Sequence, residues 1–330
     1  LVLATAPRPY DSLLEEVRTM NHGRRCPRTL FTLCVIVILV PSVTTAQDTR
    51  PKKIIYETDM CHDVDDVGAL AVLHALADSG EAEILAVMYN EVHPDAPPAI
   101  DAINTWYGRG DIPIGVYKGV LDEPDGSKYL EHVAKFSHDL DHTNVPDALT
   151  VYRQVLAQQP DNSVTIVSVG FLNNLNDLLL AEPTLVATKV DELVQMGTSN
   201  FNIASQDLAW IAQSVFEQWP TPIVFSNGGG SILSGEALSD VPEANPVREG
   251  YYRYFDKSFR GRPSWDQLTV LYGVRGVGTM FEEVTDGTHS LPTGYVWNMT
   301  PGHRTLLTHR ISDAAFLEIV EGLMTTPPAR

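Results

Sequence analysis

The fold is decided by Lys52–Ala77, KKIIYETDMCHDVDDVGALAVLHALA. From Lys53 to Tyr56 the residues alternate too little for a half-exposed strand, so they predict a buried parallel strand. After Gly68, leucines and alanines at helical spacing predict a helix. Between the strand and the helix stand four aspartates within eight residues: Asp59, Asp63, Asp65 and Asp66. The stretch therefore predicts a strand and a helix joined by an acidic turn.

Four carboxylates packed this closely repel one another and raise each other's pKa unless they share a cation. Ca²⁺ is the ion that best suits such a set of oxygen ligands, and Mg²⁺ is the second choice. Turn formation and helix capping are the alternative explanation, because aspartate favours both. An EF-hand loop starting at Asp63 fits poorly, since Val67 occupies a ligand position and His74 stands in place of the bidentate glutamate.

The strand, the acidic turn and the small-residue helix together resemble the inosine-uridine preferring nucleoside hydrolases. The motif of that family is D-x-D-x-x-x-D-D, and here Glu57, Asp59, Asp65 and Asp66 follow it with two residues inserted. The form DMCHDVDDVGALA is similar to a divergent branch of the family. The resemblance extends over roughly residues 52–273 and is dense only at its start. It implies an N-glycosyl hydrolase that uses Ca²⁺ and water to split a nucleoside into ribose and a base.

The resemblance also implies roles for residues further along the chain. The implied metal ligands are the carboxylates of Asp59, Asp66 and Asp266 and the main-chain carbonyl of Val169. Asp59 is also implied to be the general base that takes a proton from the attacking water. The residues implied to contact the sugar are Asp65, Asn90 and Asn202.

Of the positions that depart from the family pattern, three bear on the expected roles of residues. Asn200 replaces a glutamate, so a neutral amide is expected to bind a ribose hydroxyl there. Asp63 is additional, and a sugar contact, a metal ligand and a helix cap all stay open for it. Trp265 replaces the histidine that assists the leaving base, and an indole is not a useful proton donor. The base then departs with help from His62 or His93, by stacking on Trp265, or unaided.

Alternating strand and helix patterns predict an α/β fold with an open, mostly parallel, Rossmann-like sheet flanked by helices. Further buried strands are predicted at residues 82–90, 112–118, 163–170, 191–197 and 222–226. Further helices are predicted at residues 98–107, 147–158, 245–255 and 312–324. Near the end of the chain, residues 280–283 and 295–298 are expected to pair as a hairpin.

Residues 20–46 have the pattern of a signal peptide: a basic start, an apolar core LFTLCVIVILV, and a small-residue end with cleavage expected after Ala46. The core of eleven residues is too short to span a bilayer comfortably. Residues 1–19 precede a plausible initiator, Met20, and are expected to have no stable fold. We therefore expect residues 1–46 to be a leader and residues 47–330 to be one secreted or periplasmic domain. An uncleaved anchor with a short cytoplasmic tail is the alternative.

The chain carries 42 acidic and 23 basic residues, a formal net charge of −19. Such a chain repels nucleic acid and anionic membranes, so neither is expected as a partner. Cys61 is the one cysteine beyond the leader, which excludes an intramolecular disulfide there. The expected partner is a small nucleoside or another riboside, and a homo-oligomer stays open.

Two other kinds of function compete with the hydrolase. A secreted nucleoside- or ribose-binding protein would keep the metal and lose turnover, and it would bind without releasing a product. A structural Ca²⁺ site in an unrelated hydrolase would leave activity intact after Asp59→Asn. Neither explains why Asp266 and Asn202 fall where the family pattern expects them.

Overall fold

The computed structural model describes residues 50–121, 124–141, 144–204 and 208–329 of the chain. These residues belong to one unit, Asp48–Arg330. The predicted leader, with its signal peptide, lies outside the described residues. Within the described ranges, no helix combines the length and the apolar character needed to cross a membrane.

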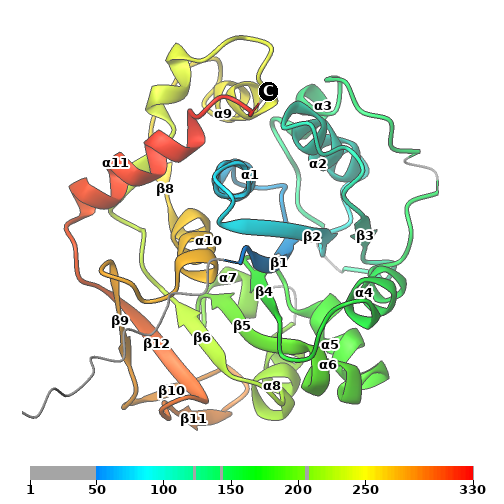
Figure 1. The fold of residues 1–330 in the computed structure, drawn as a ribbon, viewed down its shortest axis with the longest axis vertical. Helices are drawn as coiled ribbons and strands as arrows, with labels where there is room; N and C mark the ends of the chain where they lie inside the picture. The colour runs from blue at the N-terminus through cyan, green and yellow to red at the C-terminus, as the bar shows by residue number, and fades with distance from the viewer. Residues whose placement is uncertain (1–49, 122–123, 142–143, 205–207, 330) are drawn as a thin grey trace, which may run out of the picture. The chain divides into compact units, whose positions relative to one another are not determined.

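The centre of this unit is an eight-stranded sheet with the order β3-β2-β1-β4-β5-β6-β12-β9 (Figure 1). Seven of its strands are parallel: β1 (Lys52–Thr58), β2 (Ala82–Tyr89), β3 (Ile114–Val116), β4 (Val164–Ser168), β5 (Val190–Met196), β6 (Ile223–Ser226) and β12 (Arg304–His309). The edge strand β9 (Phe281–Val284) is antiparallel to β12. The predicted open, mostly parallel α/β sheet is thus confirmed.

Helices cover both faces of the sheet (Figure 1). One face carries α1 (Asp65–Asp78), α2 (Ala96–Trp106), α3 (Leu130–Val133), α9 (Pro246–Tyr254), α10 (Trp265–Arg275) and α11 (Asp313–Met324). The other face carries α4 (Ala148–Ala157), α5 (Asn173–Ala181), α6 (Pro183–Lys189) and α8 (Ala209–Gln218). Each face has its own apolar core, so the sheet is buried on both sides, as its apolar strands require.

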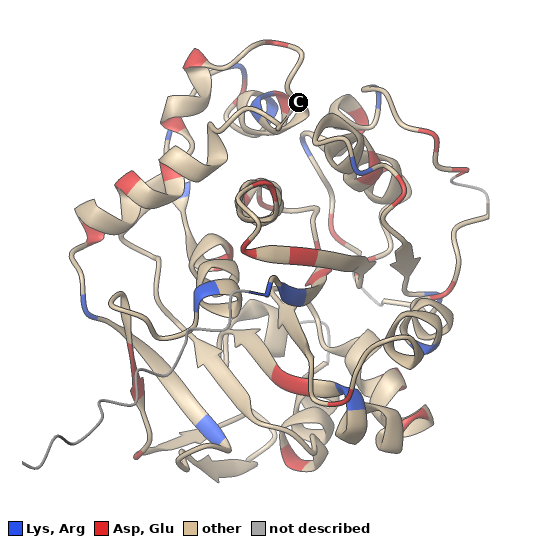
Figure 2. Ribbon diagram, viewed as in Figure 1, with Lys and Arg blue, Asp and Glu red and all other residues tan. Residues whose placement is uncertain are grey.

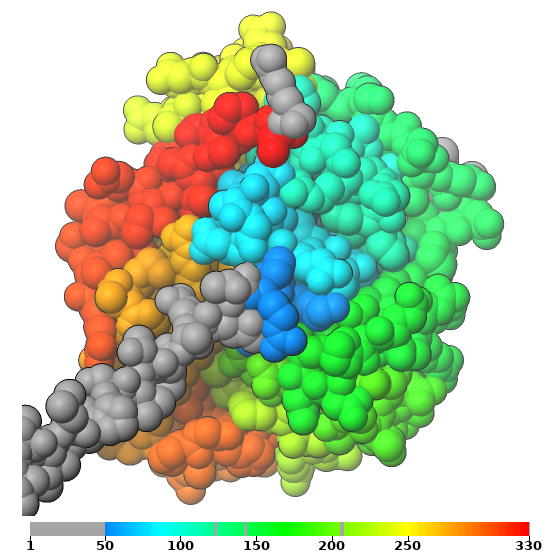
Figure 3. Space-filling view, viewed as in Figure 1, coloured from blue at the N-terminus to red at the C-terminus, as the bar shows by residue number. Residues whose placement is uncertain are grey.

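Small residues allow α1 to lie between the sheet and an outer layer of helices. Every residue of α1 from Asp65 to Leu76 is buried, and α10 and α11 pack directly on it. Figure 3 shows α11, in red, lying against α1, in cyan. A Cβ atom on Gly68 would come within 2.5 Å of Gln267 Nε2 and of Tyr251 Oη. The glycine is therefore required for this close approach.

Short elements complete the fold. They are α7 (Phe201–Ala204), β7 (Leu233–Ser234), a 3₁₀ helix (Glu236–Asp240), β8 (Arg262–Pro263), β10 (Thr288–Ser290) and β11 (Val296–Asn298). The acidic residues are spread over elements of both faces rather than gathered on one (Figure 2).

The predicted hairpin between residues 280–283 and 295–298 is wrong in its pairing. β9 instead pairs with β12, and β11 pairs with β10. The reason is that β12 extends the main sheet and offers β9 a long partner, whereas Trp297 on β11 packs against Phe216 and Phe225 in the second core. Short-range pattern cannot distinguish these pairings, because both place apolar residues inward.

The parallel strands end at one edge of the sheet, and polar or flexible residues follow them directly. Asp59 follows β1, Asn90 follows β2, Val169 follows β4, Gly197 follows β5 and Asn227 follows β6. Ligands of open α/β sheets bind outside this edge. The sheet therefore brings residues that are distant in sequence to one place.

A buried histidine lies on α1, away from this edge. His74 is fully buried, its ring stacks on Tyr107 with 4.5 Å between centroids, and its Nε2 lies 2.9 Å from Asn104 Oδ1. Because a carboxamide oxygen only accepts, Nε2 carries the proton and donates it. Nδ1 has no hydrogen-bond partner among the described residues, and burial lowers the pKa of His74 to about 3.

We predict that His74 makes the protein sensitive to acid. The unfolded chain takes up a proton near pH 6.5 and the folded chain only near pH 3, so stability falls as the pH drops through this window. The slope from this one group is about 1.4 kcal/mol per pH unit. Urea unfolding across this range should show a shallower slope for His74→Phe than for the wild type. His132→Phe, at a half-exposed position, should keep the wild-type slope, and equal slopes for all three proteins would contradict the prediction.

Candidate active site

A pocket of about 510 Å³ lies at the carboxyl edge of the sheet. We call it the acidic pocket. Its lining residues are Asp59, His62, Asp63, Asp65, Asp125, Met196, Gly197, Asn200, Phe201, Asn202, Asn227, Arg262, Trp265 and Asp266. Seven of the ten predicted site residues are in this set, so the fold gathers most of them around one cavity. The other three are Asp66, Asn90 and Val169.

Contacts from two parts of the chain hold the acidic turn in place. The Thr58 hydroxyl donates to Asp66 Oδ1 and accepts from the Met60 amide at 3.1 Å. Tyr129 donates its hydroxyl to the Asp63 carbonyl at 2.6 Å, and Cys61 Sγ lies 3.4 Å from the Asp125 carbonyl. The turn is therefore fixed from inside by β1 and from outside by the segment around α3.

Burial and mutual repulsion raise the pKa values of the aspartates. Burial is the main cause for Asp59, Asp65, Asp66 and Asp266, and the charges of neighbouring aspartates add to it. The pKa of Asp66 is raised to about 8, with Asp63 as its main charged neighbour. Asp266 is influenced by Asp65, Asp66, Asp63 and Asp59, which shows that the first turn of α10 faces the acidic turn. Such a set of carboxylates favours a bound proton or cation.

Two carboxylate oxygens in this set lack a partner. Oδ2 of Asp66 and Oδ1 of Asp266 are buried, and neither has a hydrogen bond within the described part of the chain. A buried, unpaired carboxylate oxygen is costly unless a proton or a metal ion satisfies it. The donors are hard oxygens, which suit Ca²⁺ or Mg²⁺. The residues present therefore fit a divalent cation.

A second arrangement of ligands overlaps the first. Asp63, Asp65 and Asp66 each offer an oxygen, and these three atoms lie within 4.8 Å of one another. This triad shares only Asp66 with the predicted set of Asp59, Asp66 and Asp266. Both arrangements surround the start of α1, and Asp66 is the residue common to the two.

The carbonyl of Val169 has a hydrogen-bond partner. Asn202, on α7, donates its Nδ2 to this oxygen. A carbonyl oxygen has two lone pairs, so one stays available for a cation. The contact also fixes Asn202 above the end of β4, where its carboxamide lines the acidic pocket.

Asn90 lies behind the pocket rather than in its wall. It is fully buried, its Nδ2 donates to Glu57 Oε2 at 2.7 Å, and its Oδ1 accepts from the Phe171 amide at 3.0 Å. Glu57 also accepts from Tyr152 Oη at 2.8 Å and from Asn174 Nδ2 at 3.2 Å. Burial raises the pKa of Glu57 to about 7, although these hydrogen bonds act in the opposite direction. The network positions the turn after β4, and the sugar contact of Asn90 stays a prediction.

A close approach of two strand ends depends on Gly170. A Cβ atom there would come within 2.4 Å of Asn90 Oδ1 and 2.5 Å of the Asp59 amide nitrogen. Only glycine allows the turns after β1, β2 and β4 to meet at this point.

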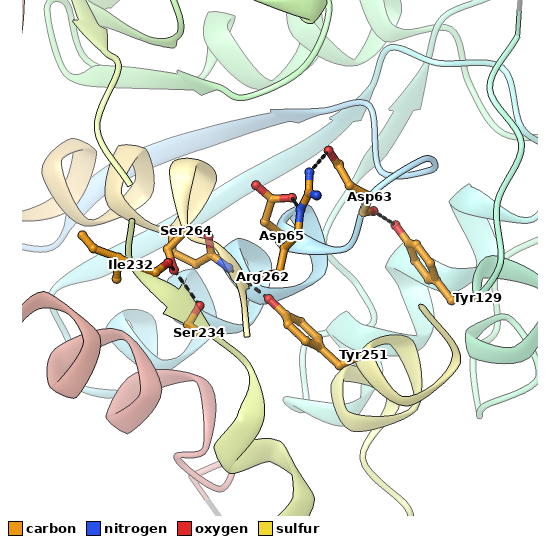
Figure 4. Close-up of polar contacts among 9 residues, drawn as sticks. Asp63, Asp65, Tyr129, Ile232, Ser234, Tyr251, Arg262 and Ser264 are labelled. Carbon is orange, nitrogen blue, oxygen red and sulfur yellow. Dashed lines mark hydrogen bonds and ion pairs between the residues drawn. The ribbon is translucent and has the colours of Figure 1, made fainter. Parts of the chain in front are cut away.

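Arg262 is a pocket residue that the sequence did not single out. Its Nη2 donates to Asp63 Oδ2 at 2.5 Å and its Nε to Asp65 Oδ1 at 3.2 Å, so the guanidinium lies between the two carboxylates (Figure 4). Its Cζ lies 5.2 Å from the ring centroid of Trp265. The sequence held no signal that separates Arg262 from the nearby Arg260. Asp125 was missed for the same reason, because it stands in a polar segment without a motif.

The two histidines considered as leaving-group acids differ in position. His62 lines the acidic pocket. His93 is absent from the described lining residues, and its Nδ1 accepts from the Asp95 amide at 3.2 Å. Only His62 of this pair is therefore placed to reach a ligand in the pocket.

Solved structures with the same architecture are nucleoside hydrolases and related proteins. The inosine-uridine preferring nucleoside hydrolase of Bacillus anthracis has a TM-score of 0.61 and 14% identity, with 83% of this chain and 99% of that chain covered. The plant nucleoside hydrolase PpNRh1 has a TM-score of 0.59 and 18% identity, covering 84% and 100%. The type III effector protein XopQ, complexed with adenosine diphosphate ribose, has a TM-score of 0.59 and 15% identity, covering 84% and 93%.

No family model and no curated protein sequence matches this chain. The fold is that of the nucleoside hydrolases, on a divergent sequence. The resemblance inferred from the acidic turn is thus confirmed at the level of the fold.

We predict that Asp266 destabilises the metal-free protein as the pH rises. The pKa of Asp266 is raised in the folded state. The protonated side chain therefore stabilises the folded protein at low pH, and this stabilisation is lost as Asp266 ionises among the other aspartates. Asp266→Asn should reduce this loss in urea unfolding with a chelator present. The expected gain is about 1–3 kcal/mol at alkaline pH, which exceeds the roughly 0.3–1 kcal/mol that an acid at a helix N-terminus contributes.

Asp286→Asn is the matched control, because Asp286 is exposed and distant from the pocket residues in sequence. It should leave the pH dependence unchanged. If Asp266→Asn instead lowers the stability of the metal-free protein at alkaline pH, the repulsion inferred among these carboxylates is absent.

Proposed function

We propose that this protein is a metal-dependent hydrolase of N-ribosyl bonds that acts on nucleosides or related ribosides. One observation carries the proposal: Asp66 and Asp266, which are distant in sequence, present buried oxygens beside Asp59 that have no hydrogen-bond partner among the described residues. They do so at the carboxyl edge of a nucleoside hydrolase fold.

The residues that would hold the cation are Asp59, Asp66 and Asp266, with the Val169 carbonyl as a main-chain ligand. We propose Ca²⁺ rather than Mg²⁺, because Ca²⁺ accepts a mixed and irregular set of carboxylate and carbonyl oxygens. When bound, the cation supplies Lewis acidity that lowers the pKa of a water molecule and binds the ribose diol.

The chain's own residues carry the other steps. Asp59 takes the proton of the attacking water, a role that its raised pKa favours because a stronger base is a better proton acceptor. The water oxygen bonds to C1′ while the C1′–N bond breaks. Asp65, Asn200 and Asn202 line the pocket and would hold the sugar hydroxyls.

The size and lining of the pocket support a nucleoside-sized ligand. Its volume of about 510 Å³ lies within the range of about 300–1,000 Å³ found for small-molecule sites. Trp265 and Phe201 offer flat apolar surfaces for a base, and the aspartates and asparagines offer partners for a sugar. The nucleosides and the adenosine diphosphate ribose of the structural neighbours belong to this class of ligand. The predicted leader would export the enzyme from the cytoplasm.

Steady-state hydrolysis of inosine, uridine and p-nitrophenyl riboside tests the proposal. Activity should disappear in a chelator and return with Ca²⁺, more fully than with Mg²⁺. Asp59→Asn should lower kcat by about 10²-fold or more, because it removes the proton acceptor. Failure of the wild type to hydrolyse any of the three ribosides with Ca²⁺ would overturn the proposal.

Two results would assign a different function. Calorimetric binding of a nucleoside without release of a base would identify a binding protein. Hydrolysis that survives Asp59→Asn would reduce the metal to a structural role.

We also predict that Ca²⁺ raises the melting temperature of the wild type and that Asp66→Asn and Asp266→Asn each abolish this rise. Metal binding to the folded state alone stabilises it in proportion to the logarithm of the metal concentration. The matched control Asp286→Asn should retain the full rise. An equal rise in all variants would place the ion elsewhere.

A further inference from the structure

The acidic pocket surrounds the departing base with negative charge. Its lining includes five aspartates: Asp59, Asp63, Asp65, Asp125 and Asp266. When the C1′–N bond breaks, its electron pair moves to the base, which therefore develops negative charge. A divalent cation offsets only part of the surrounding negative charge, so the base needs a positive group of its own.

Arg262 is the permanent cation of the pocket. Among the described lining residues the basic ones are Arg262 and His62, and only a guanidinium stays charged at every working pH. The side chain of Arg262 is 20% exposed, so its charge is partly shielded from water and acts strongly on a nearby ligand.

A flat surface beside Arg262 gives the base a place to stack. The guanidinium Cζ lies 5.2 Å from the centroid of the Trp265 ring, within the range of a cation–π contact. A planar heteroaromatic base packs well on such a ring, whereas the sugar hydroxyls find partners among the carboxylates and amides. Because the guanidinium itself lies over the Trp265 ring, a base that stacks on the rest of that face lies next to the guanidinium.

The ion pairs of Arg262 orient it for this task. Asp63 and Asp65 hold Nη2 and Nε, and these contacts fix the plane of the guanidinium (Figure 4). Nη1 has no hydrogen-bond partner within the ranges that the structure describes. The Nη1 edge of the guanidinium is thus available for a ligand.

We infer that Arg262 stabilises the negative charge that develops on the leaving group. Its Nη1 donates a hydrogen bond to the departing base while the base stacks on Trp265. This inference rests on the proposed hydrolase function. The C1′–N electron pair goes to the base, the water oxygen bonds to C1′, and Asp59 takes the water proton. Because a guanidinium is not a useful acid, the released base takes its own proton from solvent. The favoured leaving groups are bases whose edge presents a ring nitrogen or a carbonyl oxygen.

The kinetic test compares a poor and an activated leaving group. Arg262→Met should lower kcat for inosine by about 10²-fold or more, the usual effect of removing one group that stabilises developing charge. p-Nitrophenyl riboside should lose less than about tenfold, because its phenolate departs with less assistance. Arg262→Lys keeps the charge without the planar fork and should fall between the wild type and Arg262→Met on inosine.

Two controls separate this role from a structural one. Arg260→Met makes the same chemical change at an exposed position and should leave both substrates unaffected. The double variant Arg262→Met with Asp63→Asn restores the charge balance of the lost ion pair, and it should remain as slow on inosine as Arg262→Met. Equal losses on inosine and p-nitrophenyl riboside, or no loss on either, would overturn the inference.

Binding of p-nitrophenolate tests the same contact without turnover. Titration of the Ca²⁺-loaded protein, followed by absorbance, should show that Arg262→Met weakens binding by about tenfold or more and raises the pKa of bound p-nitrophenol. If the wild type hydrolyses no riboside but this loss of affinity is seen, the anion contact stands and the hydrolase proposal falls. If Arg262→Met binds p-nitrophenolate as the wild type does, the inference falls whatever the activity.

Discussion

Repulsion among buried carboxylates at the end of β1 is the constraint on which the rest of the structure depends. Asp59, Asp65, Asp66 and Asp266 are all buried, and burial raises the pKa of each, with the charges of neighbouring aspartates adding to the effect. The chain offsets this repulsion only in part, through the Thr58 hydroxyl, the N-terminus of α1 and the guanidinium of Arg262. The oxygens that have no partner among the described residues are the ones that the proposed cation would satisfy.

The surrounding fold is built to hold these carboxylates together. Gly68 lets Tyr251 and Gln267 press on α1 from outside, and Gly170 lets the turn after β4 reach the backbone of Asp59. Glu57 gathers Asn90, Tyr152 and Asn174 beneath the pocket. Packing from both faces of the sheet thus holds the mutually repelling carboxylates together. Such preorganisation keeps the ligands in place before an ion or a substrate arrives.

The sequence predicted the fold and half of the residues that line the pocket, because both depend on local signals. Buried parallel strands are apolar throughout, and the residues that follow them meet at one edge whatever the details of packing. The sequence did not predict that β9 pairs with β12 and β11 with β10. The reason is that the partner of β9 is distant from it in sequence. Arg262 and the burial of Asn90 were missed for a related reason. Their roles come from contacts with Asp63, Trp265 and Glu57, which no local pattern encodes.

The central claim is that acidic residues from the two ends of the domain share one divalent cation. A crystal structure of the Ca²⁺-loaded protein, with anomalous scattering to locate the ion, tests it most directly. We predict one peak at about 2.3–2.6 Å from both Asp66 Oδ2 and Asp266 Oδ1, the usual Ca²⁺–oxygen distance. A well-ordered pocket without a peak there, or a peak bound by the acidic turn but out of reach of Asp266, would contradict the claim.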